Sequence, residues 1–302
     1  MQYLAIDVGG TFIKFGLLTR EGEVTKAWKA PTPDNLADFF RTVGTEIKKC
    51  EPNIKGIAYS IPGKVNPKSK FVRDGGAIYY IKQLPLDEWM STQTKLPFAV
   101  INDAKAAALA EHWIGNLKGI TNGAAVVFGT GVGGGLILNN ELYEGTNYQA
   151  GEVGMLFSDS THTDTQTEVY SGSCSGVNFI RDASEILGVD KDDYKTVFKA
   201  IDNNESKEVT KLFNTYCRNA ATLIASMGIV LDLEKVVLGG GISSQEKLIT
   251  EVKRQYKSLC DKEIFGMLLQ PAEIAGCCYE NSANQIGALR HFLLETETAK
   301  NS

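Results

Sequence analysis

The stretch Phe128-Gly129-Thr130-Gly131-Val132-Gly133-Gly134-Gly135 decides the fold, because a second glycine-threonine turn, Asp7-Val8-Gly9-Gly10-Thr11, stands near the start of the chain. Each turn follows an apolar run of strand type and precedes another such run. Glycine allows positive φ values and close backbone approach, so that successive N–H groups can point at anionic oxygens, and threonine adds a hydroxyl donor. Two such turns that face each other predict a site for a polyphosphate.

Other interpretations of the glycines are weaker. Gly129, Gly131 and Gly134 satisfy the spacing of a dinucleotide-binding turn, but that turn must open a helix, and here a strand-like run, Leu136 to Leu138, follows. The chain has no G-x-x-x-x-G-K-[ST] segment, which argues against a P-loop. An ordinary hairpin turn remains the plain alternative for either turn alone. A third glycine cluster, Gly239 to Gly241, makes that alternative less attractive.

Composition limits the class of protein. The chain has 302 residues, 43% of them hydrophobic, and a net charge of −5. A chain of this length buries about 75% of its unfolded surface and should form two lobes. No long basic block is present, so a nucleic acid is not an expected partner, and no signal peptide or membrane span is recognisable, so we expect a cytoplasmic protein. The six cysteines form no C-x-x-C pair and are expected to be reduced and mostly buried.

The order of elements predicts an α/β fold. Expected strands are 3–7, 12–18, 23–28, 56–61, 98–101, 123–128, 134–138, 141–143 and 235–238. Expected helices are 35–49, 102–113, 176–187, 193–202, 206–228, 245–259 and 283–294. Two β-β-β-α units, each opening on a glycine turn, predict two related domains with an intervening cleft. We expect a small domain over 1–120, joined by a C-terminal helix at 283–298, and a large domain over 121–282.

Five motifs in this order resemble the ROK family of bacterial sugar kinases, which has the actin/hexokinase (ribonuclease H-like) fold. They are Ala5-Ile6-Asp7-Val8-Gly9-Gly10-Thr11 with Lys14, Ile101-Asn102-Asp103-Ala104, Gly129 to Gly135, Ala150-Gly151-Glu152-Val153-Gly154 and Leu238-Gly239-Gly240-Gly241-Ile242. The resemblance spans Ile6 to Leu289, and it implies ATP and Mg²⁺ as cofactors. It assigns the nucleotide to Asp7, Gly9, Gly10, Thr11, Lys14, Thr130, Gly131, Gly240 and Gly241, with Asp7 holding Mg²⁺ directly or through water.

The resemblance also makes Asp103 the expected catalytic base. A sugar hydroxyl is a poor nucleophile, so a carboxylate should accept its proton during attack on the γ-phosphoryl group. The plain alternative is that Asn102 or Asp103 only caps the helix that starts there, and both roles can coexist. The sugar would be bound by Ser60, Gly63, Asn102, Glu152 and Glu168, the last of which is placed by the weakest part of the alignment.

The chain departs from the family at its zinc site. Most members carry a histidine after Glu-x-Gly and three cysteines before the second glutamate, whereas this chain has Met155 there and no cysteine over 156–167. His162 alone does not make a zinc site, so we expect none.

The same departure affects the expected substrate. Met155 is either a gap-filler in the core or a flexible apolar surface near the anomeric end of the sugar. The second interpretation favours a zinc-less kinase that phosphorylates the 6-hydroxyl of a β-glucoside such as cellobiose, with glucokinase and N-acetylmannosamine kinase as near alternatives. A non-catalytic sugar-sensing protein is the alternative of another class. We also expect a homodimer.

Overall fold

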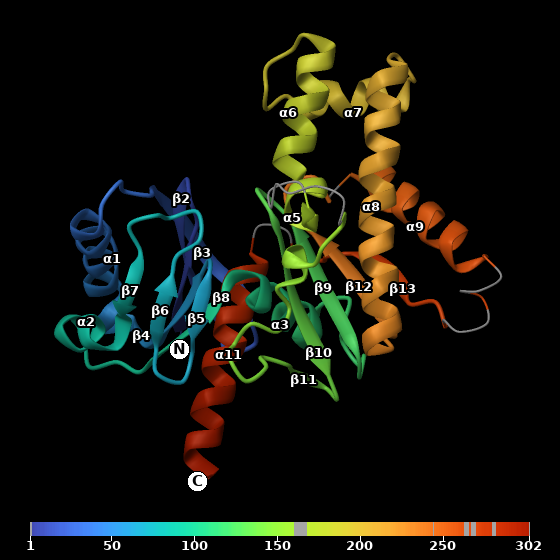
Figure 1. Cartoon of the computed structure of the whole chain (residues 1–302). Coiled ribbons are helices and arrows are strands. Elements are labelled where there is room, and N and C mark those ends of the chain that lie inside the picture. The colour runs from blue at the N-terminus through green and yellow to red at the C-terminus, as the bar shows by residue number, and fades with distance from the viewer. Residues whose placement is uncertain are drawn as a thin grey trace. The chain divides into compact units, whose positions relative to one another are not determined.

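A computed structural model describes residues 2–159, 168–243, 245–262, 266, 270–279 and 282–301 of the chain. The chain divides into two compact units, which Figure 1 shows with their elements labelled. Unit 1 comprises residues 1–115, 144–150 and 281–302, and unit 2 comprises 116–143 and 151–280. The expected boundary at 120 falls at 115/116 in this division, and the segment 144–150 belongs to unit 1 although it was expected in the large domain.

Unit 1 is built on a five-stranded sheet of order β3-β2-β1-β4-β8. Its strands are β1 (Gln2–Val8), β2 (Phe12–Leu18), β3 (Val24–Pro31), β4 (Ile54–Ile61) and β8 (Phe98–Asn102). The first three strands are antiparallel, while β4 and β8 run parallel to β1. A second, three-stranded sheet consists of β5 (Lys64–Asn66), β6 (Phe71–Asp74) and β7 (Lys82–Pro85).

The two faces of the five-stranded sheet bury different helices because strand side chains alternate. Leu4, Ile6 and Val8 belong to the core cluster that also contains residues of α1 (Leu36–Cys50) and α2 (Leu86–Gln93). The other face packs against α11 (Ala283–Asn301), which in turn packs against α3 (Asp103–Ile114). Odd-numbered residues of β1, among them Asp7, therefore face α11.

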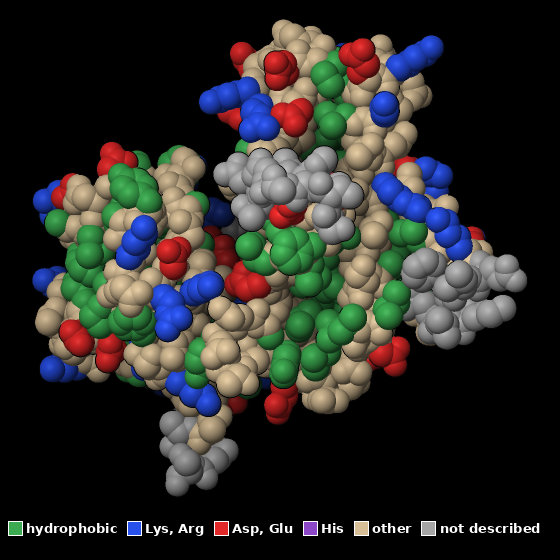
Figure 2. Space-filling view, viewed as in Figure 1, with side chains coloured by type: hydrophobic (Ala, Val, Ile, Leu, Met, Phe, Trp, Pro, Cys, Tyr) green, Lys and Arg blue, Asp and Glu red, His purple; other side chains and the backbone are tan. Residues whose placement is uncertain are grey.

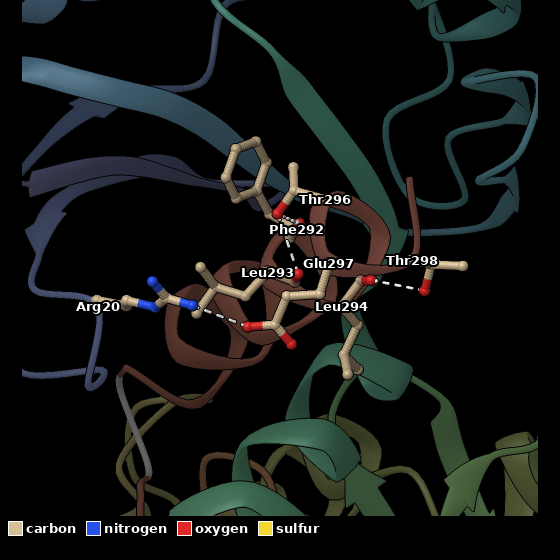
Figure 3. Close-up of polar contacts among 7 residues, drawn as sticks. All are labelled: Arg20, Phe292, Leu293, Leu294, Thr296, Glu297 and Thr298. Carbon is tan, nitrogen blue, oxygen red and sulfur yellow. Dashed lines mark hydrogen bonds and ion pairs between the residues drawn. The ribbon is translucent and has the colours of Figure 1, made fainter. Parts of the chain in front are cut away.

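Small residues let α11 lie close to this sheet and to α3. A Cβ on Gly56 would come within 2.2 Å of the Phe292 ring, and a Cβ on Gly287 would come within 1.7 Å of the Ala106 carbonyl oxygen. Larger side chains at these glycines would push the helix away. The far part of α11 is tied by an ion pair of 2.9 Å between Arg20 and Glu297, which Figure 3 shows. These contacts hold α11 at a fixed depth against the sheet and α3.

Unit 2 repeats the topology of unit 1. Its sheet has the order β11-β10-β9-β12-β13. When the strands of each sheet are counted along the chain, both sheets have the order 3-2-1-4-5. The strands are β9 (Gly123–Phe128), β10 (Val132–Leu138), β11 (Glu141–Leu142), β12 (Lys235–Gly239) and β13 (Glu273–Gly276). The helices are η2 (Val153–Met155), α5 (Tyr170–Ser173), α6 (Gly176–Leu187), α7 (Tyr194–Asp202), α8 (Lys207–Leu231) and α9 (Glu246–Cys260).

The expected elements are present with ends shifted by a few residues, and the two sheets of one topology confirm the expected fold class. The sheet β5-β6-β7, helix α2, strand β13 and the short helices η1 (Glu51–Asn53), η2 and α5 were not expected. No helix among the described residues is long and apolar enough to cross a bilayer. Four of the cysteines are buried, Cys277 is half-buried and Cys278 is exposed.

Candidate functional site in two parts

Three parallel strands of unit 1 end at one edge of the sheet and bring the expected polar residues together. Asp7 is in register with Ser60 across β1 and β4, and Ile61 is in register with Asn102 across β4 and β8. Asp103 follows as the first residue of α3. The carboxyl ends of parallel strands, in open α/β sheets, are where ligands bind. This edge, with the loop at Gly63, forms the unit 1 part of the candidate site.

Asn102 is the N-cap of α3 and also a neighbour of the expected base. Its Oδ1 accepts a hydrogen bond from the Lys105 backbone N–H at 3.1 Å. Its Nδ2 donates to the Gly63 carbonyl at 3.0 Å and to Asp103 Oδ1 at 3.0 Å. Both amide hydrogens are therefore engaged, and the side chain is only 8% exposed. The capping role that the sequence left open belongs to Asn102, and it coexists with a contact to Asp103.

Asp103 is held at the start of α3 by two donors. Its Oδ1 accepts from the Ala104 backbone N–H at 2.8 Å as well as from Asn102. Two donors on one carboxylate oxygen fix the torsion of the side chain, which is the kind of orientation that a general base needs. Asp103 is half-buried, at the carboxyl edge of the sheet.

Asp7 is a buried carboxylate, 5% exposed, with three polar partners. Its Oδ1 accepts from Ser60 Oγ at 3.1 Å and from Asn284 Nδ2 at 3.0 Å. Its Oδ2 lies 3.7 Å from Lys14 Nζ. Burial raises the pKa of Asp7, and the contacts with Asn284, Lys14 and Ser60 oppose this rise. The expected magnesium residue is thus a desolvated carboxylate on β1, with partners from β2, β4 and α11 of unit 1.

The first glycine turn joins β1 to β2 beside Asp7. The Gly9 backbone N–H donates to the Phe12 carbonyl at 3.1 Å, and Thr32 Oγ1 donates to the Gly9 carbonyl at 2.6 Å. Gly10 and Thr11 are exposed at the tip of the turn. Their backbone and hydroxyl groups are placed where an anionic ligand can reach them.

In unit 2 the second and third glycine motifs lie against each other. Gly240 has a φ of 109°, and a Cβ there would come within 2.1 Å of the Phe128 carbonyl oxygen, so only glycine fits. The Gly129 carbonyl accepts from Val177 N–H at 3.3 Å and from Ser175 Oγ at 3.4 Å. The N-terminus of α6 therefore lies at this turn and adds the partial positive charge of a helix N-terminus. Thr130 and Gly241 are exposed.

The two expected glutamates of unit 2 lie on either side of an exposed apolar strip. Gly151, which has a φ of 89°, packs against the Gly134 carbonyl of β10 and directly precedes Glu152 in the chain. The Glu168 carbonyl accepts from the Ser158 backbone N–H at 2.5 Å. The strip between these two contacts is Met155, Leu156 and Phe157, which are 62%, 45% and 72% exposed.

Met155 is therefore not a gap-filler in the core, which corrects one of the two interpretations of this residue. Figure 2 shows hydrophobic side chains gathered on the part of unit 2 that carries η2 and β10. His162 lies outside the described residues, and among those described no three histidine, cysteine or acidic side chains form a metal-binding group.

Sequence reasoning missed several contacts of the expected residues. Asn284 contacts Asp7 although it lies 277 positions further along the chain, and the sequence around it does not distinguish it from other asparagines. Ser171 Oγ accepts from the Val132 backbone N–H at 3.1 Å, just after the second turn. Ser60, expected at the sugar, is fully buried with its hydroxyl on Asp7. The helix signal at 176–187, with Ser175 before it, could have suggested the dipole at the second turn.

The fold and these turns define a chain of the actin/hexokinase class. Comparison with known proteins gives the family: the ROK family model matches residues 3–293, and the chain belongs to the ROK family. It is 31% identical to a β-glucoside kinase of Listeria monocytogenes over 98% of both chains. It is 29% identical to a glucokinase of Halalkalibacterium halodurans over 85% of both. A ROK family protein of Streptococcus pneumoniae, solved in complex with sucrose, matches with a TM-score of 0.88 and 28% identity over 99% of this chain and 100% of that one.

Proposed function

We propose that this chain, a carbohydrate kinase by its family and its full-length kinase relatives, transfers the γ-phosphoryl group of ATP to the 6-hydroxyl of a β-glucoside such as cellobiose. The observation that carries the proposal is the edge of the unit 1 sheet, where the strand register places Asp7, Asn102 and Asp103. A carboxylate for a metal and an oriented carboxylate for a hydroxyl are the two groups that phosphoryl transfer to an alcohol requires.

Asp103 acts as general base in this mechanism. It accepts the proton of the 6-hydroxyl while the hydroxyl oxygen attacks phosphorus and the bond to the ADP oxygen breaks. The donors from Ala104 and Asn102 hold Oδ1 and so orient the carboxylate during the transfer. Backbone N–H groups of the glycine turns then stabilise the charge that develops on the phosphate oxygens.

The residues present fit a phosphate-bound Mg²⁺. The donor at the proposed metal position is a hard carboxylate oxygen of Asp7, and Mg²⁺ is commonly held by one or two carboxylates together with substrate phosphates. When bound, Mg²⁺ neutralises charge on the phosphates. Lys14 lies beside the same carboxylate and offers a second cation to the nucleotide. We propose no zinc site, since the family's histidine and cysteines are replaced in this chain.

We propose nucleotide-binding roles for the glycine motifs of each unit. Gly9, Gly10 and Thr11 in unit 1, and Thr130 and Gly131 in unit 2, would bind the phosphates through backbone and hydroxyl donors. Gly240 and Gly241 would lie against the adenosine. The exposure of Gly10, Thr11, Thr130 and Gly241 supports these roles, since each can be reached by a ligand.

The sugar would contact Gly63, Asn102, Glu152 and Glu168, with Ser60 supporting Asp7. The β-glucoside is favoured over a free hexose because Met155 is exposed beside Phe157 and next to Glu152 in the chain. An apolar, adaptable surface tolerates an added group at the anomeric carbon, whereas a site that pairs with a hydroxyl rejects the analogue without it. The glucokinase and N-acetylmannosamine kinase alternatives remain the competing substrates. We further propose a cytoplasmic homodimer.

The test compares kcat/KM for cellobiose, glucose and N-acetylmannosamine. Turnover is measured as the release of ADP in the presence of ATP and Mg²⁺. We expect cellobiose to be preferred. A preference of about tenfold for either monosaccharide, which corresponds to roughly 1.4 kcal/mol in transition-state free energy, rejects the disaccharide while leaving kinase activity in place. No turnover with any sugar of a broad panel would contradict the kinase mechanism itself.

A further inference from the structure

Two neutral donors from distant parts of unit 1 converge on one oxygen of Asp7. Ser60 Oγ, from the end of β4, and Asn284 Nδ2, from the first turn of α11, both donate to Oδ1, at 3.1 and 3.0 Å. The other oxygen, Oδ2, lies toward Lys14, whose side chain is 40% exposed. The carboxylate is therefore fixed with Oδ1 turned inward and Oδ2 on the side of an exposed cation.

We infer that Asn284 is a positioning residue for Asp7, which it holds so that Oδ2 addresses the nucleotide-bound Mg²⁺. This inference rests on the proposed function, because it takes Asp7 to be the magnesium residue. A single carboxylate that must meet a small cation with strict octahedral geometry needs a fixed torsion, and a hydrogen bond from a side-chain amide supplies one.

A purely structural role, in which Asn284 only docks α11 on the sheet, explains less. The docking of α11 is already secured by apolar packing, such as the contact of the Phe292 and Tyr3 rings at 5.5 Å between centroids, and by the close approach of Gly287 to Ala106. The Arg20–Glu297 ion pair ties the other end. A link that served docking alone would not need a buried carboxylate, which is costly to desolvate. This desolvation cost is explained if the Asp7 carboxylate binds a ligand at the edge of the sheet.

The variant Asn284→Ala removes the donor and leaves Ser60 and Lys14 in place. The control is Thr298→Ala on the same helix, which removes a hydroxyl that donates to the Leu294 carbonyl. ADP binding is measured by calorimetry over a series of Mg²⁺ concentrations and in EDTA, so that the readout does not depend on turnover. Thermal unfolding of each variant is recorded alongside.

We expect Asn284→Ala to need roughly tenfold more Mg²⁺ for the same gain in ADP affinity, the effect of one hydrogen bond to a charged group. Its ADP affinity in EDTA should stay within about twofold of the wild type, and Thr298→Ala should match the wild type throughout. If Asn284→Ala does not fold, the same test is made with Asn284→Leu, which keeps the branching and the number of side-chain heavy atoms and lacks the donor.

Two results overturn the inference, and they are distinguishable. A folded Asn284→Ala protein with the Mg²⁺ dependence of the wild type shows that the asparagine only supports the fold, and the proposed function stands. A wild-type protein whose ADP affinity is indifferent to Mg²⁺ removes the magnesium role of Asp7. In that case the proposed magnesium role of Asp7 and the inference fail together.

Discussion

Nδ2 of Asn102 donates a hydrogen bond of 3.0 Å to Oδ1 of Asp103, although the two residues are neighbours in the chain. The same amide reaches Gly63 with its second hydrogen, while its oxygen caps α3. One side chain therefore links the loop after β4, the start of a helix and the proposed base. The orientation of Asp103 depends on this link.

The variant Asp103→Asn tests the proposed base. The amide keeps the shape of the carboxylate but cannot take a proton, so we expect kcat to fall about 10²- to 10⁴-fold, with ATP and sugar affinity largely kept. The matched control is Asp87→Asn, an exposed acid in the first turn of α2, which should leave kcat unchanged. Turnover of Asp103→Asn near that of the wild type would refute the assignment.

Two variants separate the capping role of Asn102 Oδ1 from the donor role of its Nδ2. Asn102→Ala should lower the free energy of unfolding by about 1 kcal/mol through the lost cap, and kcat should fall as well. Asn102→Ser keeps a capping oxygen but has no amide to reach Gly63 and Asp103. We therefore expect the serine variant to regain stability in denaturant unfolding while its kcat stays low. Recovery of both quantities together would show that capping is the whole role of Asn102.

The raised pKa of Asp7 predicts an unusual dependence of stability on pH. The native state binds the proton more tightly than the unfolded chain, so the contribution of Asp7 to stability falls as pH rises from the ordinary aspartate pKa through the native one. Above that window the full cost of the buried charge is present. Asp7→Asn should therefore raise Tm at neutral pH, and its advantage should shrink toward zero below the ordinary aspartate pKa. A lower Tm for Asp7→Asn at neutral pH is the contrary result.

Gly287→Ala tests the close approach of α11 to α3. The added Cβ would meet the Ala106 carbonyl oxygen at 1.7 Å, so the helices must separate, at a cost of about 1–3 kcal/mol or more in unfolding free energy. Because α3 begins with Asp103, we expect kcat to fall as well. Leu294→Ala, at a partly exposed position of the same helix, should cost much less. Equal losses of stability in the two variants would argue against this close contact.

Met155→Ala tests the apolar strip. Since Met155 is 62% exposed, the free energy of unfolding should change by less than about 0.5 kcal/mol. If the strip contacts the group at the anomeric carbon, kcat/KM for cellobiose should fall while that for glucose is kept. Ile229→Ala, which truncates an exposed residue on α8 of the same unit, is the control. If kcat/KM falls equally for both sugars, or for neither, the strip does not determine the choice of substrate.

The local part of the fold could be predicted from sequence, because each signal lies within a few residues. The glycine turns, the strand after Gly131 and the asparagine start of α3 are all patterns of this kind. The sheet β5-β6-β7 was missed because its strands have three or four residues and carry polar side chains such as Lys64, Arg73 and Lys82. Strands of that length give too few alternations to detect.

The candidate site was predictable as a set of motifs and not as a set of contacts. The motifs that contain Asp7, Asn102 and Asp103 indicated chemistry through their resemblance to the ROK family, and the parallel register of β1, β4 and β8 is what brings them to one edge. The partners of Asp7 escaped prediction because they lie far away in the chain: Ser60 is 53 positions and Asn284 is 277 positions from Asp7. Hydrogen bonds over such separations leave no periodic pattern in the sequence. The exposure of Met155 likewise depends on tertiary packing that its neighbours in the chain do not reveal.

The place of α11 in the chain has a consequence for biosynthesis. Unit 1 starts with the first strand and gains α11 only after every residue of unit 2 has been translated. At about 5–20 residues per second, roughly 10–30 s separate the synthesis of α3 from that of α11 on the ribosome. During that interval the nascent sheet of unit 1 exposes the small-residue face that α11 later covers, and Asp7 lacks Asn284. Unit 2, although encoded second, is therefore the first of the two whose residues are all available to fold, and a chaperone that shields the nascent chain would meet unit 1.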